Sequence, residues 1–170
     1  MIFNRFVKDA RRCVEGAVEE ARLLGHDSVG DEDLLLGILH TGEGPAAESL
    51  SSLGVTLDSA HEESERFLSE ALSSIGISLE EVRRCAGDAF EMRLPGDRRI
   101  PFSPRAKEAL EQALREARRL GDNRITSEHV LLGILRNEDG TAVRMLASLG
   151  APPAAVEDRL DQVRGRTTGR

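Results

Sequence analysis

The sequence predicts an all-α protein of two pseudo-symmetric four-helix repeats, and three observations support this prediction. The segment VGDEDLLLGIL at 29–39 occurs again as ITSEHVLLGIL at 125–135, 96 positions later. Between residues 6 and 54, about twenty of roughly fifty positions are identical at that offset, which defines an internal repeat. No segment shows the sustained period-two alternation of a strand. Because each copy repeats an irregular order of helices, we expect a pseudo-twofold pair rather than an open solenoid.

Each copy of the repeated segment predicts a turn followed by a short buried helix. Asp31 and Ser127 are the predicted N-caps, because a side-chain oxygen there can accept a hydrogen bond from a free amide of the first turn. Glu32 and Glu128 follow at the predicted first helical position, where a carboxylate interacts favourably with the helix dipole. The apolar runs that come next indicate burial on several sides.

One glycine recurs inside the apolar run of each copy, as Gly37 and Gly133. A glycine within a helix costs roughly 1 kcal/mol relative to alanine. Its recurrence at the same place therefore indicates that this helix packs closely against a neighbour.

The remaining helices of the first copy follow from caps and helix-ending residues. A first helix is expected at 4–24, with Asn4 as its cap and Gly25 as its end, and a third helix is expected at 46–53. An acidic helical insert is predicted at 58–73, which enlarges this copy.

A further helix is expected at 78–90, where Ser78 is the cap and Glu81 stands at the capping-box position. In the second copy Ser103 is the predicted cap of the long helix, with Pro104 in its first turn. The predicted domain boundaries are 1–90 for the first repeat with its insert at 58–73, 91–101 for a linker, 102–163 for the second repeat, and 164–170 for a flexible tail.

Composition and charge exclude several classes of function. The net charge of -7 argues against nucleic-acid and anionic-membrane binding, because phosphate contacts require a basic face. No apolar run reaches the length of a membrane span, and the N-terminus lacks a signal core, so a cytoplasmic location is predicted. Cys13 and Cys85 are expected to be reduced and at least partly buried.

The sequence gives no indication of catalysis. The four histidines show no metal-ligand spacing with one another, and no serine or cysteine stands in a recognisable nucleophile setting. No G-x-x-x-x-G-K-[ST] phosphate loop occurs in the chain. We therefore predict a protein that is not an enzyme, with no catalytic residue, no metal and no cofactor.

The two copies and their junction resemble the Clp amino-terminal domain, in particular that of ClpC-type unfoldases. The resemblance rests on the paired pattern [VI]-[GT]-x-E-x-[LV]-L-L-G-I-L, preceded each time by E-A-R-x-L-G, and on the junction IPFSPRAK at 100–107. It extends from Phe3 to about Val163. It implies a compact helical domain that receives adaptors and substrates ahead of an ATP-driven unfoldase ring, with Clp unfoldase components as partners.

The resemblance also implies recognition of arginine-phosphorylated proteins at the start of each short helix. Helix-start amides and a hydroxyl would take the phosphate, and the glutamate would take the guanidinium. In the second copy the matching residues are Thr126, Ser127, Glu128 and His129. In the first copy Glu32 matches the glutamate, but Asp31 and Asp33 add negative charge beside an incoming phosphate.

A second candidate surface comprises Phe3, Phe102 and Lys107. These residues match positions that the mycobacterial ClpC-type domain uses to bind cyclic peptide antibiotics. The alternative is that a phenylalanine at a helix start packs into the core as a hydrophobic staple.

The leading functional hypothesis is a non-catalytic binding module that engages substrates, adaptors or phosphoarginine degrons and modulates Clp proteolysis. The alternative is a structural or regulatory protein that docks onto a basic partner through its acidic insert, with both ligand sites vestigial. A third interpretation is that the 170 residues are a piece of a longer unfoldase.

Overall fold

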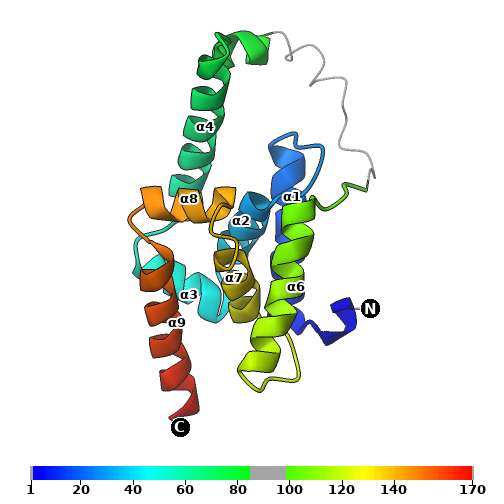
Figure 1. The fold of residues 1–170 in the computed structure, drawn as a ribbon, viewed down its shortest axis with the longest axis vertical. Coiled ribbons are helices and arrows are strands. Elements are labelled where there is room, and N and C mark those ends of the chain that lie inside the picture. The colour runs from blue at the N-terminus through cyan, green and yellow to red at the C-terminus, as the bar shows by residue number, and fades with distance from the viewer. Residues whose placement is uncertain (1, 85–98, 170) are drawn as a thin grey trace.

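The computed structural model describes residues 2–84 and 99–169, and over these residues the chain is helical, which confirms the all-α prediction (Figure 1). A short 3-10 helix, η1 (Ile2–Arg5), precedes the first repeat. The first repeat contains α1 (Lys8–Leu23), α2 (Asp31–Thr41), α3 (Gly44–Ser52) and α4 (Leu57–Ser74). The second contains α6 (Pro104–Arg119), α7 (Ser127–Leu135), α8 (Thr141–Ser148) and α9 (Pro153–Thr168).

Two isolated β-bridges join the copies and reveal their pseudo-twofold relation. Phe6 pairs with Ile125, and Val29 pairs with Phe102. The offset of 96 that turns Phe6 into Phe102 also turns Val29 into Ile125, so each bridge is the image of the other. Each carries two main-chain hydrogen bonds of 2.8 or 2.9 Å. The segment before the long helix of one copy is thus held by the segment before the short helix of the other.

A single core spans both copies. The buried apolar side chains of α1, α2 and α3 belong to the same cluster as those of α6, α7, α8 and α9. α2 and α7 lie near the centre of the molecule (Figure 1), and every residue of α7 is buried. This position explains why the two repeated segments are apolar nearly all round.

The glycine prediction is confirmed at both helix crossings. A methyl group on Gly37 would lie 2.2 Å from the carbonyl oxygen of Cys13 in α1, and one on Gly133 would lie 2.2 Å from that of Ala109 in α6. Such distances are far inside van der Waals contact. Each short helix can therefore pack on its long helix only because no side chain stands at the crossing.

The predicted start of the first helix was wrong. α1 begins at Lys8, with Val7 as an N-cap that has no side-chain cap bond, while Asn4 lies in η1. The physical reason is the bridge from Phe6 to Ile125, which keeps the preceding residues out of the helix.

The predicted caps of the two short helices were also displaced by one residue. Gly30 and Thr126 are the N-caps, so Asp31 and Ser127 stand at the first helical position, and the glutamates that follow stand at the second. In the second copy, by contrast, Ser103 caps α6 as predicted, because its Oγ accepts a hydrogen bond from the amide of Ala106 at 3.1 Å.

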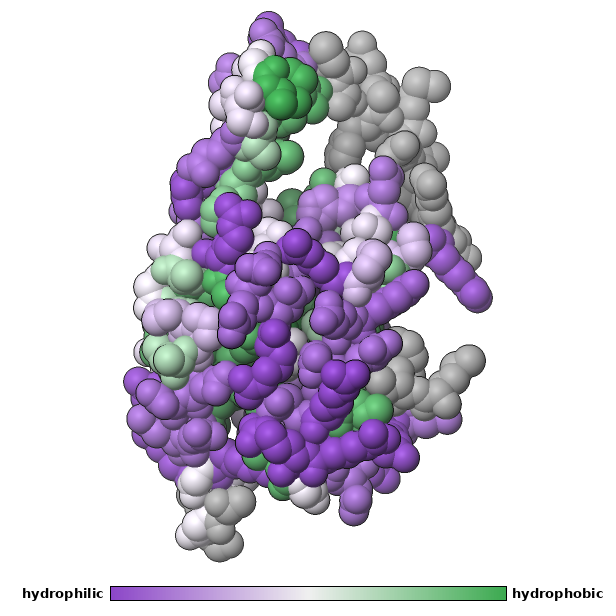
Figure 2. Space-filling view, viewed as in Figure 1, coloured by the Kyte–Doolittle hydropathy of each residue, from purple (hydrophilic) through white to green (hydrophobic). Residues whose placement is uncertain are grey.

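The acidic segment of the first copy forms α4, and its position along the chain matches that of α9. Leu57 begins α4 and Pro153 begins α9, again 96 positions apart. By this offset α4 is the first copy's counterpart of α9, so the additional length of the first copy follows Ser74. The far half of α4 is exposed and projects from the rest of the molecule (Figures 1 and 2).

Only parts of the helix expected at 78–90 and of the predicted linker lie within the described residues. The expected capping box is present, because the Glu81 amide donates to Ser78 Oγ at 3.2 Å and the Ser78 amide donates to Glu81 Oε2 at 3.3 Å. The rest of that helix, Cys85 and most of the predicted linker lie outside the described residues. Most of the predicted flexible tail at 164–170 belongs to α9, which continues to Thr168, and its flexibility stays a prediction.

Candidate functional site

The start of α7 is held by a chain of side-chain contacts. His129 accepts a hydrogen bond from the amide of the N-cap Thr126 at Nδ1, over 3.0 Å. A ring nitrogen that accepts carries no proton, so the proton is on Nε2, which lies 3.1 Å from the Asp122 carboxylate. The neutral tautomer of His129 therefore joins the helix start to the loop before it.

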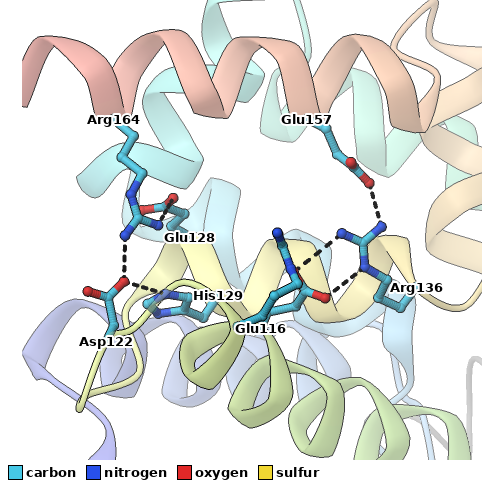
Figure 3. A network of polar contacts seen from close by, with 8 residues as sticks. Glu116, Asp122, Glu128, His129, Arg136, Glu157 and Arg164 are labelled. Carbon is cyan, nitrogen blue, oxygen red and sulfur yellow. Dashed lines mark hydrogen bonds and ion pairs between the residues drawn. The ribbon is translucent and has the colours of Figure 1, made fainter.

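An arginine of the same chain occupies the acidic side of this site (Figure 3). Arg164 in α9 donates from Nη1 to Glu128 Oε1 at 3.1 Å and from Nη2 to Asp122 Oδ2 at 2.7 Å. Glu128 is buried except for 8% of its surface. The glutamate that the family resemblance assigns to a ligand guanidinium thus already binds a guanidinium. Arg164 is absent from the predicted site residues because its segment has the polar composition of a tail.

The other residues predicted for the second copy divide between interior and surface. Ser127 and His129 are buried, and Ser127 Oγ has no hydrogen-bond partner among the described residues. In this conformation only Thr126 and Glu128 of the predicted set have exposed surface.

In the first copy both aspartates of the motif are buried and have partners. Asp31 accepts a hydrogen bond from the Ala142 amide at 3.0 Å and so caps α8 of the other repeat. Asp33 accepts from the Gly30 amide at 2.9 Å and lies 3.0 Å from Nδ1 of His26. The two carboxylates that were expected to face an incoming phosphate are therefore engaged inside the protein.

Glu32 differs from Glu128 because no arginine or lysine among the described residues pairs with it. Its carboxylate folds back over the N-cap, since a methyl group on Gly30 would lie 2.3 Å from Glu32 Oε2. Burial, together with the neighbouring charges of Asp33 and Asp31, raises the pKa of Glu32 to about 7. A cation near this carboxylate would relieve the cost of ionising it.

The residues of the predicted hydrophobic surface are only partly accounted for. Phe102 is half-buried against the core, as a staple would be, but retains some exposure, and Lys107 is exposed. The side chain of Phe3 lies outside the described residues.

A basic pocket of about 430 Å³ lies beside the bridge from Phe6 to Ile125. It is lined by Phe6, Val7, Lys8, Arg11, Arg12, Glu15 and Arg124. Sequence reasoning did not find this pocket, although the spacing of the basic residues at 8, 11 and 12 places them close together on one helix. Arg124 joins them from the loop that leads into α7, and only the fold brings it there.

The fold and this site define a class of protein, namely a duplicated helical domain with a cluster of charged side chains at the start of each of its two central helices. The sequence profile described as the Clp repeat (R) N-terminal domain matches residues 5–74, 67–149 and 101–169. The chain therefore belongs to the Clp repeat N-terminal domain family, as the resemblance indicated.

Known proteins that resemble the chain agree with this assignment. The chaperone protein ClpC2 of Oryza sativa subsp. japonica, a chloroplast protein by name, is 40% identical over 167 residues, which is 98% of this chain. The crystal structure of the N-terminal domain of ClpD from Arabidopsis thaliana superposes with a TM-score of 0.66 at 26% identity, covering 94% of this chain and 97% of that one. The Hsp104 N-terminal domain of Candida albicans shares the fold at a TM-score of 0.65 and 16% identity, over 94% of this chain and 91% of that one.

The chain spans about 16% of the length of the ClpC relatives that it matches. Along the described residues, no helix combines the length and apolarity needed to cross a bilayer.

Proposed function

We propose that this domain is a non-catalytic binding module for a Clp unfoldase, which engages substrates or adaptors and reads phosphoarginine through its second repeat. The observation that carries the proposal is the contact of Glu128 with the guanidinium of Arg164 at 3.1 Å. A carboxylate that binds an arginine of its own chain has the position and chemistry to bind an arginine of a substrate.

The basic pocket supports the phosphate half of the same proposal. Lys8, Arg11 and Arg124 line it, and Arg124 lies four residues before Glu128 in the chain. The protein as a whole has a net charge of -7, so this pocket is a locally basic region, and its charge suits a phosphate. In the proposed complex the guanidinium of phosphoarginine binds Glu128, and Arg124 is the pocket residue that we expect to contact the phosphate.

Binding at Glu128 requires that Arg164 leave its place. The internal guanidinium therefore competes with a ligand and lowers the apparent affinity, because only the fraction of molecules with Arg164 displaced can bind. This competition makes Arg164→Ala an informative variant, since it opens the site without touching the residues that contact the ligand.

The test is calorimetric titration with free phosphoarginine, with arginine and inorganic phosphate as controls. We expect saturable binding by the natural sequence, loss of binding in Glu128→Ala, and binding at least about threefold tighter in Arg164→Ala. We expect the arginine control to bind weakly. Arg124→Ala should weaken the binding of phosphoarginine and leave that of arginine unchanged.

Glu32→Ala is the matched control, because it makes the same change at the equivalent position of the other repeat. It should leave binding at the second repeat intact. Absence of saturable binding in both the natural sequence and Arg164→Ala, with the fold confirmed by circular dichroism, would refute the phosphoarginine proposal.

The alternative function, docking onto a basic partner through residues 58–73, has weaker support. Several acidic side chains of α4 are neutralised within the chain, since Arg66 pairs with Glu63 and Glu70 and Arg83 pairs with Glu65. The observation that favours docking is an exposed apolar side chain, because Ile75, near the end of α4, is 68% exposed. If a partner protein docks on this end of α4, the substitution Ile75→Ser should abolish its binding.

Two finer predictions accompany the proposal. The partly exposed Phe102 and the exposed Lys107 remain our candidate contacts for a cyclic peptide antibiotic, to be tested by titrating such a peptide against Phe102→Ala.

A cytoplasmic location also remains our prediction, and fractionation of cells is its test, since several relatives are chloroplast proteins by name.

A further inference from the structure

Three side chains at the start of α2 bring together ligand atoms of the kind that hold a metal ion. These are His26 from the loop before the helix, and Glu32 and Asp33 from its first turn. One ligand atom from each lies within 4.8 Å of the others, and no other such group occurs among the described residues. Asp33 is fully buried, whereas His26 and Glu32 are partly exposed, so the group has one fixed wall and an open side.

The second repeat contains an equivalent group of side chains, and there a cation is bound to it. At the offset of 96, the equivalent residues are Asp122, Glu128 and His129, again one imidazole and two carboxylates. There the guanidinium of Arg164 lies against both carboxylates and neutralises them. The residue equivalent to Arg164 is Leu68, which is 49% exposed, so the first repeat has the same acidic group without its cation.

We propose that His26, Glu32 and Asp33 form a binding site for a divalent transition-metal ion, with Zn²⁺ as the probe of choice. The mixture of imidazole nitrogen and carboxylate oxygen suits zinc and its neighbours better than magnesium or calcium, which prefer oxygen alone. Three protein ligands leave a fourth position for water.

The observed distances are compatible with this geometry. Two ligands that bind tetrahedral zinc at 2.0–2.1 Å are separated by about 3.3 Å. His26 Nδ1 lies 3.0 Å from each Asp33 oxygen, so this pair needs to open by only a few tenths of an ångström. Glu32 completes the site by a change of rotamer, which its partial exposure permits.

Two effects oppose metal binding, namely the dipole of α2 and the protonation of His26. The positive end of the α2 dipole disfavours a cation, but in the second repeat Arg164 binds at the same place relative to α7. A proton on His26 also competes, because a metal ion binds only the neutral imidazole. Binding must therefore strengthen as the pH rises.

The experiment is titration of the metal-free protein with Zn²⁺ by calorimetry at a pH slightly above neutral, repeated in two buffers of different ionisation enthalpy. Bound Co²⁺ provides a second readout through its visible absorption. We expect one equivalent of metal, with proton release. Glu32→Gln and His26→Ala should each weaken binding by roughly 10- to 100-fold or more.

Glu128→Gln is the matched control, because it alters the equivalent carboxylate in the repeat whose cation site is filled by Arg164. It should leave zinc affinity unchanged, and circular dichroism verifies that each variant is folded. If His26→Ala fails to fold, Glu32→Gln alone decides, since its side chain is partly exposed. Absence of zinc binding to the natural sequence, or binding that survives Glu32→Gln, would overturn the proposal. Neither result bears on the phosphoarginine titration of the second repeat.

Discussion

His26 Nδ1 lies 3.0 Å from both carboxylate oxygens of Asp33, and the second repeat makes the same contact with the residue types exchanged, between Asp122 and His129 at 3.1 Å. In both repeats the helical residue of the pair, Asp33 or His129, also accepts a hydrogen bond from the amide of the N-cap residue of its own helix. The two repeats thus start their central helices by one device, in which a third-position side chain caps the helix and a loop residue seven positions earlier holds it.

This exchange predicts the outcome of swapping the first pair. His26→Asp places a carboxylate against Asp33, and the repulsion should reduce the free energy of unfolding by about 1–3 kcal/mol. Combining it with Asp33→His recreates the arrangement of the second repeat and should recover most of that loss. Urea unfolding in the presence of a chelator measures both variants without a contribution from bound metal. A double variant no more stable than His26→Asp would contradict the exchange.

Local patterns predict the helices, because these depend on neighbours three or four positions apart, whereas the duplication and the glycine crossings follow from identities at the offset of 96. Contacts across the repeats could not be predicted in that way. The local pattern predicts that Asp31 caps its own helix, yet Asp31 caps α8, 111 positions away in the chain. Composition predicts a tail around Arg164, although the position of this residue relative to Glu128 is set by the packing of α9. The candidate sites depend on just these long-range contacts.

The cap that crosses between the repeats gives a matched pair of stability predictions. Asp31→Ala removes the acceptor for the Ala142 amide at the start of α8 and should cost about 0.5–2 kcal/mol. Ser127→Ala makes the equivalent change in the other repeat, where the buried hydroxyl has no partner, and should be neutral or slightly stabilising. Chemical unfolding distinguishes the two. Equal losses in both variants would mean that the cap across the repeats contributes nothing specific.

The helix crossing at Gly37 predicts that a residue with better helix propensity will destabilise the protein. Gly37→Ala gains up to about 1 kcal/mol in propensity but places a methyl group 2.2 Å from a main-chain oxygen of α1, and overpacking should produce a net loss of about 1–3 kcal/mol. Gly165→Ala in α9 is the control, because a methyl group there meets no atom within 4 Å. Thermal unfolding should therefore show opposite shifts for the two variants, and a stabilising Gly37→Ala would show that α1 and α2 can separate at little cost.

Glu116 predicts how stability depends on acid. Its carboxylate accepts hydrogen bonds from Arg136 and Arg119, each at 2.9 Å, and these contacts hold its pKa below the ordinary value of 4.5. Because the folded state binds this proton less readily than the unfolded state, the contribution is fully present above pH 4.5 and is lost as the pH falls through the lowered pKa. Glu116→Gln should therefore cost about 1–3 kcal/mol near neutral pH and progressively less in acid. Urea unfolding of both proteins across the acidic range measures this difference, and a difference that stays constant with pH would show that the ion pairs do not act through the charge of Glu116.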